Sequence, residues 1–374
     1  MRALVFLAML TIPVHAAELQ IGYLSLDADP RYTLTRAEAR IDPLPHGNAL
    51  PGAELGIADT QMQLLHADTS IVLDQRSGMD AASLVDALQS MSASVVLTDL
   101  PGEFLAAVAG ASPDRLLINI SASEDALRCL PYVLHTIPSD RMAADAIAQL
   151  LTARKWTRVL LLEGEEPRDK QLADDFAAAA ERYRLQLVDR RQFALATDPA
   201  NRAENNTLLL TGNLDYDVVY IADSVGDFAP YLPYGTALPR PVMGSAGLKA
   251  VAWHWSADRY GAPQVNGRFV KAAKQRMREA DWAAWMAVKL VAEAVLAGAT
   301  DAQSIRAALL SDTIQVDGSK GIAEAFRPWD GQLRMPMLLA TDSKVIAMAP
   351  FDGFAHQANE LDTLGVDAPE HVCP

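Results

Sequence analysis

The sequence lacks the signatures of the commonest nucleotide-binding and catalytic sites. No GxGxxG follows an expected strand and no GxxxxGK(S/T) occurs, so the usual phosphate-binding loops are missing. There is no GxSxG nucleophile motif, no HxxxH among the seven histidines, and no EF-hand loop. His254 has no nucleophile or orienting acid that can be matched to it, which favours a packed histidine over a catalytic one. The sequence therefore predicts no enzyme, no cofactor and no zinc site.

Positive charge is also scarce. The chain has 32 Lys and Arg against 47 Asp and Glu, which gives a formal net charge of −15 at pH 7. Binding to nucleic acid or to an anionic membrane surface requires a basic face. The charge balance therefore argues against both kinds of partner.

Long apolar runs are missing after the first sixteen residues. Arg2 precedes an apolar stretch at 3–12, and Val14-His15-Ala16 has the small-x-small pattern of a cleavage site. This pattern predicts a secretory signal peptide at 1–16, which is too short for a spanning helix. The Arg-rich, Ala-rich composition is typical of GC-rich bacterial coding, so we expect export to the periplasm.

Cysteine is nearly absent. Cys129 and Cys373 are the two cysteines of the chain, and their spacing is not that of a CxxC redox or zinc motif. In an oxidising compartment a pair of cysteines is more often bridged than free. We therefore expect one disulfide that ties the C-terminal tail to the body, with two free thiols as the alternative.

What the sequence does contain is an alternation of short apolar segments with amphipathic helical segments. Nearly continuous hydrophobic runs, typical of parallel strands covered on both faces, predict strands at 19–26, 70–73, 95–98, 116–120, 159–162, 218–222 and 242–243. Helical periodicity predicts helices at 142–154, 169–183 and 281–297, and Asp301 is placed to cap a further helix. The alternation predicts an α/β fold with parallel sheets.

The same rhythm suggests two domains of similar size. The alternation of predicted strands and helices continues to about residue 120, begins again after Pro138, and is interrupted near 239–247. We expect chain crossings near Pro138, near 244–248 and near 318–327. Lobe 1 would comprise 17–137 and 248–320, lobe 2 would comprise 138–247 and 321–350, and 351–374 would form a C-terminal tail. Residues 29–56 are expected to form a long loop.

Polar residues at the expected strand ends are the candidate ligand-binding residues. In open parallel sheets, ligands bind beyond the carboxyl ends of the strands, and a small ligand often lies between two domains. Ser121 has a structural alternative, because with Glu124 it fits a capping box. Asp223 has one too, because aspartate often starts a turn. The predicted residues are Asp27, Asp99, Leu100, Ser121 and Ala122 in lobe 1, and Glu163, Asp223 and Ser245 in lobe 2.

Several segments resemble, in order, the type I periplasmic solute-binding proteins of ABC transporters, the kind that includes branched-chain amino acid-binding proteins. LQIGYLSL resembles their opening strand. RLLINISASEDALR followed by PYVLHTIPSDRMAADAIAQLL resembles their passage into the second lobe. The resemblance covers nearly the whole mature chain. It implies two Rossmann-like lobes with parallel central sheets joined by a three-strand hinge, and an exported binding subunit with permease and ATPase partners.

A narrower resemblance concerns the segments LPRPVMGSAGL, AWHW, RYGAPQVNGRF, DWAAWMAVK and RPWDGQLRMPMLLA. They are similar to the branch of this family that accompanies PQQ-dependent alcohol dehydrogenases, which implies a link to that oxidation system. Relatives that bind amino acids hold the carboxylate with hydroxyls and backbone N–H groups after the third strand. This chain has TDLPGEF there, and Asp99 would repel a carboxylate unless it were protonated or paired. We therefore expect a cationic, amine, polyhydroxylated or alcohol-like ligand.

Three other hypotheses stay open at this point. The same fold serves as a sensor that passes ligand information to a membrane partner. Carboxylates in the cleft could instead hold a hard metal ion, calcium or a lanthanide, for the dehydrogenase. An enzyme using Asp99 and Asp223 as a general acid and base has the least support, because the sequence supplies no nucleophile, electrophile or cofactor cradle.

Overall fold

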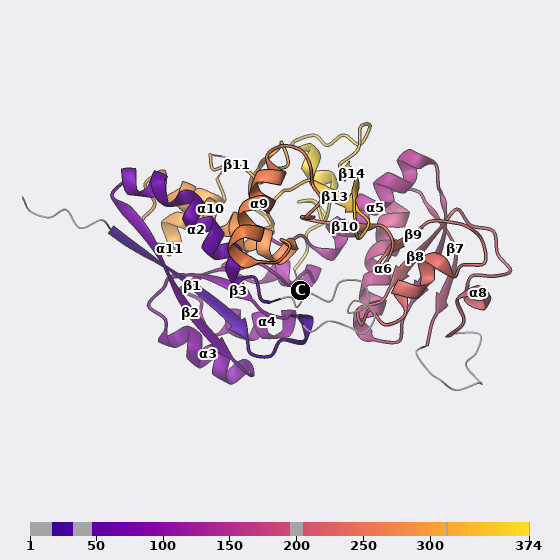
Figure 1. Ribbon diagram of the computed structural model, residues 1–374, viewed down its shortest axis with the longest axis horizontal. Helices are drawn as coiled ribbons and strands as arrows, with labels where there is room; N and C mark the ends of the chain where they lie inside the picture. Colours follow the sequence, from indigo (N-terminus) through magenta and orange to yellow (C-terminus); the bar gives the residue numbers. More distant parts are fainter. Residues whose placement is uncertain (1–16, 33–46, 195–204, 312, 374) are drawn as a thin grey trace, which may run out of the picture.

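The computed structural model describes residues 17–32, 47–194, 205–311 and 313–373. The expected signal peptide at 1–16 and the middle of the expected long loop at 29–56 lie outside these residues. Figure 1 shows two lobes side by side along the long axis, with a small antiparallel sheet between them. Across the described ranges, every helix is too short or too polar to cross a membrane.

Lobe 1 is built on a parallel sheet whose strand order is β2-β1-β3-β4-β5. The inner strands β3 and β4 are buried at every position because helices cover both faces, whereas the edge strand β2 carries exposed polar residues in its second half. The strands are β1 (Ala17–Leu26), β2 (Thr69–Gly78), β3 (Val95–Asp99), β4 (Leu116–Asn119) and β5 (Val133–His135). The helices are α2 (Leu50–His66), α3 (Ala81–Ser90), α4 (Gly102–Gly110), α9 (Ala262–Ala273), α10 (Glu279–Leu296) and α11 (Ala302–Leu309).

Helices α2 and α10 pack very closely, which joins two parts of lobe 1 that are far apart in the sequence. A Cβ atom at Gly52 of α2 would lie 2.0 Å from the backbone oxygen of Asp281. One at Gly56 would lie 2.8 Å from the Cβ of Val288. Glycine at these two positions therefore lets the helix backbones approach, and the return of the chain to lobe 1 depends on it.

Lobe 2 has a second parallel sheet with the order β7-β6-β8-β9. Tyr220 of β8 stacks on Phe176 of α6 with ring centroids 3.6 Å apart, which fixes that helix on the sheet. The strands are β6 (Arg158–Glu163), β7 (Gln186–Gln192), β8 (Val218–Ala222) and β9 (Val242–Gly244). The helices are α5 (Asp140–Arg154), α6 (Pro167–Arg182) and the short α8 (Thr207–Leu210).

The chain passes between the lobes at three places. The first connection lies between β5 and α5, and the second between β9 and β10 (Lys249–Val251). Gln332 pairs with His135 at the edge of the lobe 1 sheet, whereas β13 (Met337–Ala340) pairs with β10 and β14 (Val345–Ala349). The third connection therefore lies closer to 333–336 than to 318–327. A two-residue ladder, β11 (Val316–Asp317) with β12 (Ala323–Glu324), precedes it.

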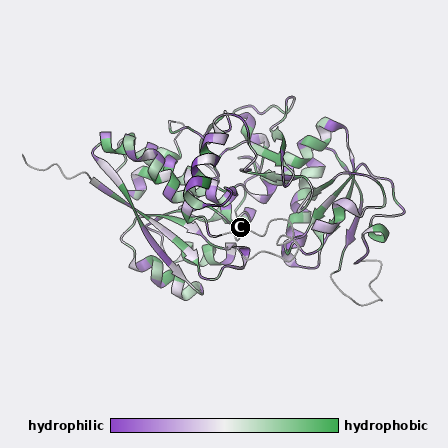
Figure 2. Cartoon of the chain, viewed as in Figure 1, coloured by the Kyte–Doolittle hydropathy of each residue, from purple (hydrophilic) through white to green (hydrophobic). Residues whose placement is uncertain are grey.

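The predicted α/β class with parallel central sheets is confirmed. All seven predicted strands are present, and β8 begins and ends where the sequence places it. Asp301 caps α11, since its carboxylate accepts the Ser304 N–H at 2.8 Å. Figure 2 shows hydrophobic residues along the strands of both lobes, and the fully buried side chains include Trp282 and Trp285 of α10.

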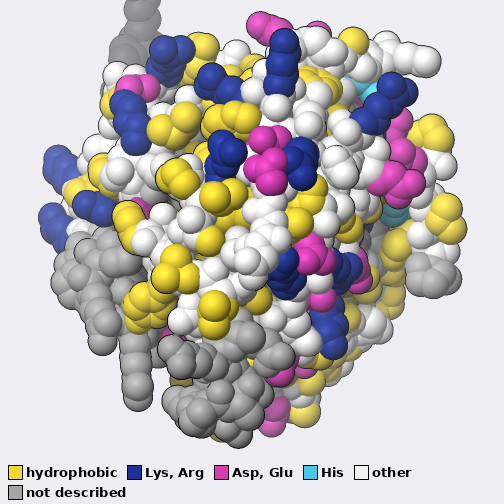
Figure 3. All heavy atoms as spheres, turned by 90° about the vertical axis from the view of Figure 1, so that its right-hand side faces the viewer, with side chains coloured by type: hydrophobic (Ala, Val, Ile, Leu, Met, Phe, Trp, Pro, Cys, Tyr) yellow, Lys and Arg dark blue, Asp and Glu magenta, His cyan; other side chains and the backbone are white. Residues whose placement is uncertain are grey.

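The surface of lobe 2 carries mixed charge. Figure 3 views the end of the molecule that lies at the right of Figure 1, and acidic and basic side chains are interspersed there. A face of this kind offers no single-sign field to a polyanion.

Candidate functional site

The carboxyl ends of β1, β3 and β4 meet at one edge of the lobe 1 sheet. Ser25 pairs with Asp99 between β1 and β3, and Thr98 pairs with Asn119 between β3 and β4. The loops that follow these strands therefore start at the same level. The parallel sheet thus brings Asp99 close to the Ser121 loop, as expected for a ligand-binding edge.

Asp99 is fully buried, and its carboxylate is occupied by donors from the protein itself. Oδ2 accepts hydrogen bonds from the Tyr23 hydroxyl at 2.7 Å and the Ala49 N–H at 2.9 Å. Oδ1 accepts from the Tyr32 hydroxyl and from Nη2 of Arg31 at 3.2 Å. Burial and then the nearby Asp99 charge raise the pKa of Tyr23 well above its ordinary value, so that this hydroxyl stays a donor. Asp99 thus holds Tyr23, Tyr32 and Arg31 together from beneath. We call the surface formed by Arg31, Tyr32 and the Ser121 loop the lobe 1 wall.

Arg31 is the charged group that this wall exposes, and sequence reasoning missed it. Its Nε donates to Asp29 Oδ2 at 2.9 Å, and its Nη2 pairs with Asp99. Its Nη1 donates to the Ser121 hydroxyl at 2.9 Å. The side chain is 29% exposed, whereas those of Asp29 and Asp99 are 2% and 0% exposed. The two acids therefore hold the guanidinium in place while part of it faces solvent.

The loop after β4 is shaped by Asn119. Its Oδ1 accepts the N–H groups of Ser121 and Ala122 at 3.2 and 2.9 Å. The Ser121 hydroxyl accepts from Arg31 and donates to the Leu100 carbonyl at 3.3 Å. Ser121 is thus engaged across the sheet edge instead of in a capping box with Glu124. Leu100 and Ala122 are buried, and the Ala122 carbonyl accepts from Asn119 Nδ2 at 2.7 Å and from Arg128 Nη1 at 3.3 Å.

Two other predicted residues lie apart from this network. Asp27 is exposed at the end of β1, and its backbone N–H donates to Gly78 O at 2.8 Å. Glu163 at the end of β6 forms an ion pair with Arg190 of β7, and Arg190 also contacts Asp174 at 2.6 Å. In the described residues, neither acid takes part in the hydrogen bonds of the lobe 1 wall.

Asp223 ends β8 and holds the loop that follows. Its Oδ1 accepts the Gly226 N–H at 2.8 Å, and its Oδ2 accepts the N–H groups of Phe228 and Ala229 at 3.0 and 2.7 Å. The Asp223 N–H in turn donates to the Ser245 hydroxyl at 2.9 Å, which links the ends of β8 and β9. These three accepted bonds favour the turn-capping alternative for Asp223.

We expect Asp223→Ala to lower the free energy of unfolding by about 1–3 kcal/mol, because three N–H groups lose their acceptor. Urea unfolding followed by circular dichroism measures the change. The matched control is Asp227→Ala, an exposed acid of the same loop, which should stay within about 0.5 kcal/mol of wild type. Unchanged stability of Asp223→Ala together with weakened ligand binding would instead assign Asp223 to the ligand.

Arg168 of α6 reaches from lobe 2 to the loop after β4 in lobe 1. Its Nη2 donates to the Ser123 hydroxyl at 3.0 Å, and its Nη1 lies 2.6 Å from Asp140 Oδ2. Arg31 and Arg168 thus approach two serines of one loop, Ser121 and Ser123, from different lobes. This arrangement places hydrogen-bond donors on both sides of the loop.

Three acids beside Arg168 test the metal-ion alternative. One carboxylate oxygen from each of Asp125, Asp140 and Asp175 lies within 4.8 Å of the others. Burial, followed by repulsion from the other two acids, raises the pKa of Asp175 to about 7. Arg168 already pairs with Asp140, and Asp125 Oδ2 accepts the Arg141 N–H at 3.0 Å. A calcium-like ion takes six to eight oxygen ligands, so these residues fit an ion-pair network better than a metal cage.

Two of the hollows in the described part of the molecule are lined by residues other than Asp99, Ser121 and Ser245. One of about 410 Å³ lies beside the ends of β6 and β7, and is lined by Glu165, Arg191, Gln192, Phe193, Ala194, Leu209 and Leu210. The other, of about 240 Å³, lies beneath the C-terminal segment and includes Arg128, Cys129, Asp330 and His371. All five donors of Arg128 are already used by Gln332 and backbone carbonyls, so the second hollow offers no free guanidinium group.

No protein-family model matches the sequence, and no curated protein matches it significantly. Solved structures do match over both lobes. A branched-chain amino acid ABC transporter periplasmic ligand-binding protein from Burkholderia xenovorans has 13% identity and a TM-score of 0.68, over 88% of this chain and 95% of that one.

Two further structures contain ligands. A solute-binding protein of an ABC transporter from Rhodopseudomonas palustris, in complex with 3,4-dihydroxybenzoic acid, has 12% identity and a TM-score of 0.63, over 87% and 93% of the chains. A branched-chain amino acid transporter substrate-binding protein from Streptococcus pneumoniae, in complex with isoleucine, has 16% identity and a TM-score of 0.64, over 88% and 98%. The fold is therefore that of the type I periplasmic binding proteins, as the sequence resemblance predicted.

Proposed function

We propose that this protein is the exported substrate-binding subunit of an ABC transporter and binds a small molecule between its two lobes. The observation that carries the proposal is the match of both lobes, over most of the chain, to binding proteins of such transporters. Three chain connections between two rigid sheets permit closure by a hinge motion. The matching structures are binding proteins, which supports binding without catalysis.

The proposed ligand contact in lobe 1 is the Arg31–Ser121 pair, together with the backbone at Leu100. Ser245 is the proposed contact from lobe 2. Because Asp99 is buried behind Arg31 and pairs with it, the expected repulsion of a carboxylate is weakened at this wall. The proposed ligand therefore carries a hydrogen-bond acceptor, and carboxylates belong among the candidates beside alcohols and polyols.

We expect Arg31→Lys to weaken ligand binding by roughly tenfold to a hundredfold, because it loses a charge-assisted, planar donor while keeping its charge. Ligands are first identified by thermal shift, since a ligand of the folded state alone raises stability. The panel contains isoleucine, 3,4-dihydroxybenzoate, amines, alcohols, aldehydes, PQQ, calcium and lanthanum. Titration calorimetry of each hit then compares wild type with Arg31→Lys.

The matched control is Arg76→Lys, which changes an exposed arginine paired with Asp74 on β2. It should leave affinity unchanged. Equal affinities for wild type and Arg31→Lys would remove Arg31 from the site. A hit that leaves the radius of gyration unchanged at saturation would contradict closure of the lobes.

We further propose that the transporter serves PQQ-dependent alcohol oxidation, with a sensor of the same fold as the alternative. The support is the sequence resemblance alone. Deletion of the gene in its natural host tests the link, and unaltered growth on alcohols would argue against it.

A further inference from the structure

The C-terminal segment lies across the hinge between the lobes. We call residues 359–373 the C-terminal strap. It includes the short 3-10 helix η5 (Glu360–Thr363) and follows β14 after a short loop. In Figure 1 the C-terminus lies between the two lobes. The strap contacts both lobes and the third connection, and these contacts are of different kinds.

The middle of the strap is bound to lobe 2 by hydrogen bonds. The Gly365 N–H donates to Asp145 Oδ2 of α5 at 2.8 Å, and Arg182 of α6 donates to the Gly365 carbonyl at 2.8 Å. The Tyr183 hydroxyl donates to the Thr363 carbonyl at 2.6 Å. Gly365 has a φ of +90°, and a Cβ there would lie 2.8 Å from Met142 Cγ, so glycine lets the strap lie directly on α5.

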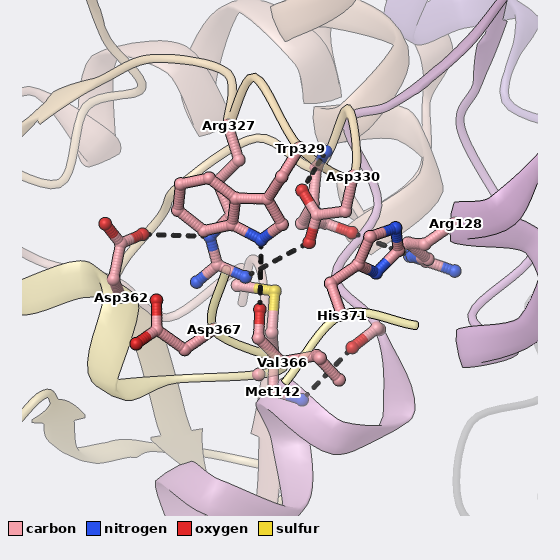
Figure 4. A network of polar contacts seen from close by, with 12 residues as sticks. Arg128, Met142, Arg327, Trp329, Asp330, Asp362, Val366, Asp367 and His371 are labelled. Atoms are coloured by element: carbon pink, nitrogen blue, oxygen red, sulfur yellow. Dashed lines mark hydrogen bonds and ion pairs between the residues drawn. The ribbon is translucent and has the colours of Figure 1, made fainter. Parts of the chain in front are cut away.

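The same part of the strap is also bound to the segment that leads into the third connection. Asp362 accepts from Nε of Arg327 at 2.9 Å and from Nε of Arg334 at 2.8 Å. The Trp329 indole N–H donates to the Val366 carbonyl at 3.2 Å. Figure 4 shows the Arg327 and Trp329 side chains directed at the strap. Arg327 and Asp362 are each 1% exposed, so this pair is shielded from salt and solvent.

The end of the strap is bound to lobe 1 by a covalent bond. Cys373 forms a disulfide with Cys129, at the end of the 3-10 helix η2 (Asp125–Cys129) between β4 and β5. Between Val366 and this disulfide the chain makes a turn, in which the N–H groups of Glu370 and His371 donate to the Asp367 carbonyl at 2.9 and 3.0 Å. Cys373 is exposed and Cys129 half-buried, so a reductant reaches the bond from solvent.

We propose that the C-terminal strap is a brace across the hinge, and that the Cys129–Cys373 disulfide makes this brace redox-sensitive. With the disulfide intact, a rotation of lobe 2 away from lobe 1 must unwind the 367–371 turn or break the contacts on α5 and α6. A dithiol reductant converts this disulfide to two thiols by thiol–disulfide exchange and is itself oxidised to a disulfide. The strap then keeps its buried contacts on lobe 2 and, among the described residues, only the hydrogen bonds and ion pairs of Arg327, Trp329 and Arg334 still link it to the lobe 1 side. Reduction therefore enlarges the range of open conformations without unfolding either lobe. When more open conformations are populated, the free energy needed to reach the closed, binding-competent state rises, and the ligand affinity falls.

The test needs no ligand and therefore stands apart from the proposed function. Small-angle scattering gives the radius of gyration, and hydrogen exchange reports on the hinge bonds from His135 N–H to Gly331 O and from Leu333 N–H to His135 O. Wild type is measured oxidised, reduced with a phosphine, and reoxidised. We expect a larger radius of gyration or several-fold faster exchange at the hinge after reduction, with recovery on reoxidation.

The matched variants are Cys373→Ser and Cys129→Ser, which remove the same bond from opposite ends and should behave alike. Asp362→Asn weakens the ionic half of the brace and should add to the effect of Cys373→Ser. Exchange within β6 and β8 controls for unfolding of lobe 2. If a cysteine variant fails to fold, reduction of wild type decides alone. Unchanged scattering together with unchanged hinge exchange would overturn the proposal.

Discussion

Replacement of Asp99 by alanine is expected to lower the free energy of unfolding by about 3–5 kcal/mol. The carboxylate is fully buried and accepts from two tyrosine hydroxyls, one backbone N–H and Arg31. Removing it leaves the hydroxyls of the buried Tyr23 and the half-buried Tyr32 without their acceptor, and Arg31 loses one of its two paired carboxylates. Urea unfolding with linear extrapolation measures the loss.

Two variants separate this buried role from a general effect of charge. Asp99→Asn keeps the shape and one acceptor oxygen, so it should lose clearly less stability than Asp99→Ala. Asp27→Ala removes an exposed acid at the end of the neighbouring strand and should stay within about 0.5 kcal/mol of wild type. If Asp99→Ala unfolds at wild-type urea concentrations, the network around Asp99 contributes nothing, and the account of the lobe 1 wall is wrong.

The strand positions followed from the sequence because hydrophobicity and strand burial express the same physical constraint. A parallel strand covered by helices on both faces must be apolar at every position, as Val218–Ala222 is. Strand β7 was not placed because it lies at the sheet edge and its second half, residues 189–192, is wholly polar. The hydrophobic run that marks a central strand is absent there.

For the candidate site, the sequence predicted which strand ends lie close together but not the contacts that their side chains make. The rule that ligands bind beyond strand ends located the Asp99 and Ser121 loops, which the structure brings together. It could not show that Asp99 is buried, because its partners Tyr23, Tyr32 and Ala49 come from distant parts of the chain. For the same reason the prediction that Asp99 would repel a carboxylate did not foresee Arg31.

Asp223 differs from Asp99 because its hydrogen-bond partners are close to it in the sequence. Its partners lie within six residues, so a turn cap could be named from the sequence as an alternative to a ligand contact. What the sequence could not decide was whether the carboxylate oxygens were left free for a ligand. That depends on how the loop folds back onto the strand end.

Lys320, a buried lysine near the hinge, is the second residue whose replacement is expected to change the free energy of unfolding strongly. The Lys320 ammonium lies 3.0 Å from Glu324 Oε1, and donates to the carbonyls of Ala252 at 3.2 Å and Pro336 at 3.1 Å. It also lies 3.8 Å from the centroid of the Trp282 ring. Ala252 follows β10 and Pro336 precedes β13, so one ammonium group joins the ends of the second and third connections.

We expect Lys320→Met to lower the free energy of unfolding by about 3–5 kcal/mol at pH 9, because it leaves Glu324 buried without its counter-charge. Burial raises the pKa of Glu324 to about 7 even while Lys320 opposes the shift. A raised folded-state pKa means that stability is present at low pH and is lost as pH rises through that pKa. Below about pH 7 Glu324 is protonated with or without Lys320, so the variant should then lose less.

Without Lys320 the folded-state pKa of Glu324 moves higher still, so ionisation keeps costing stability where wild type has levelled off. The gap between the two proteins should therefore widen from pH 6 to pH 9, by up to about 1.4 kcal/mol per pH unit. Urea unfolding across this range measures it. The double variant Lys320→Met with Glu324→Gln removes both charges and should recover most of the loss. A gap that is the same at pH 6 and pH 9 would show that Lys320 acts through its carbonyl and ring contacts, and not through the buried charge of Glu324.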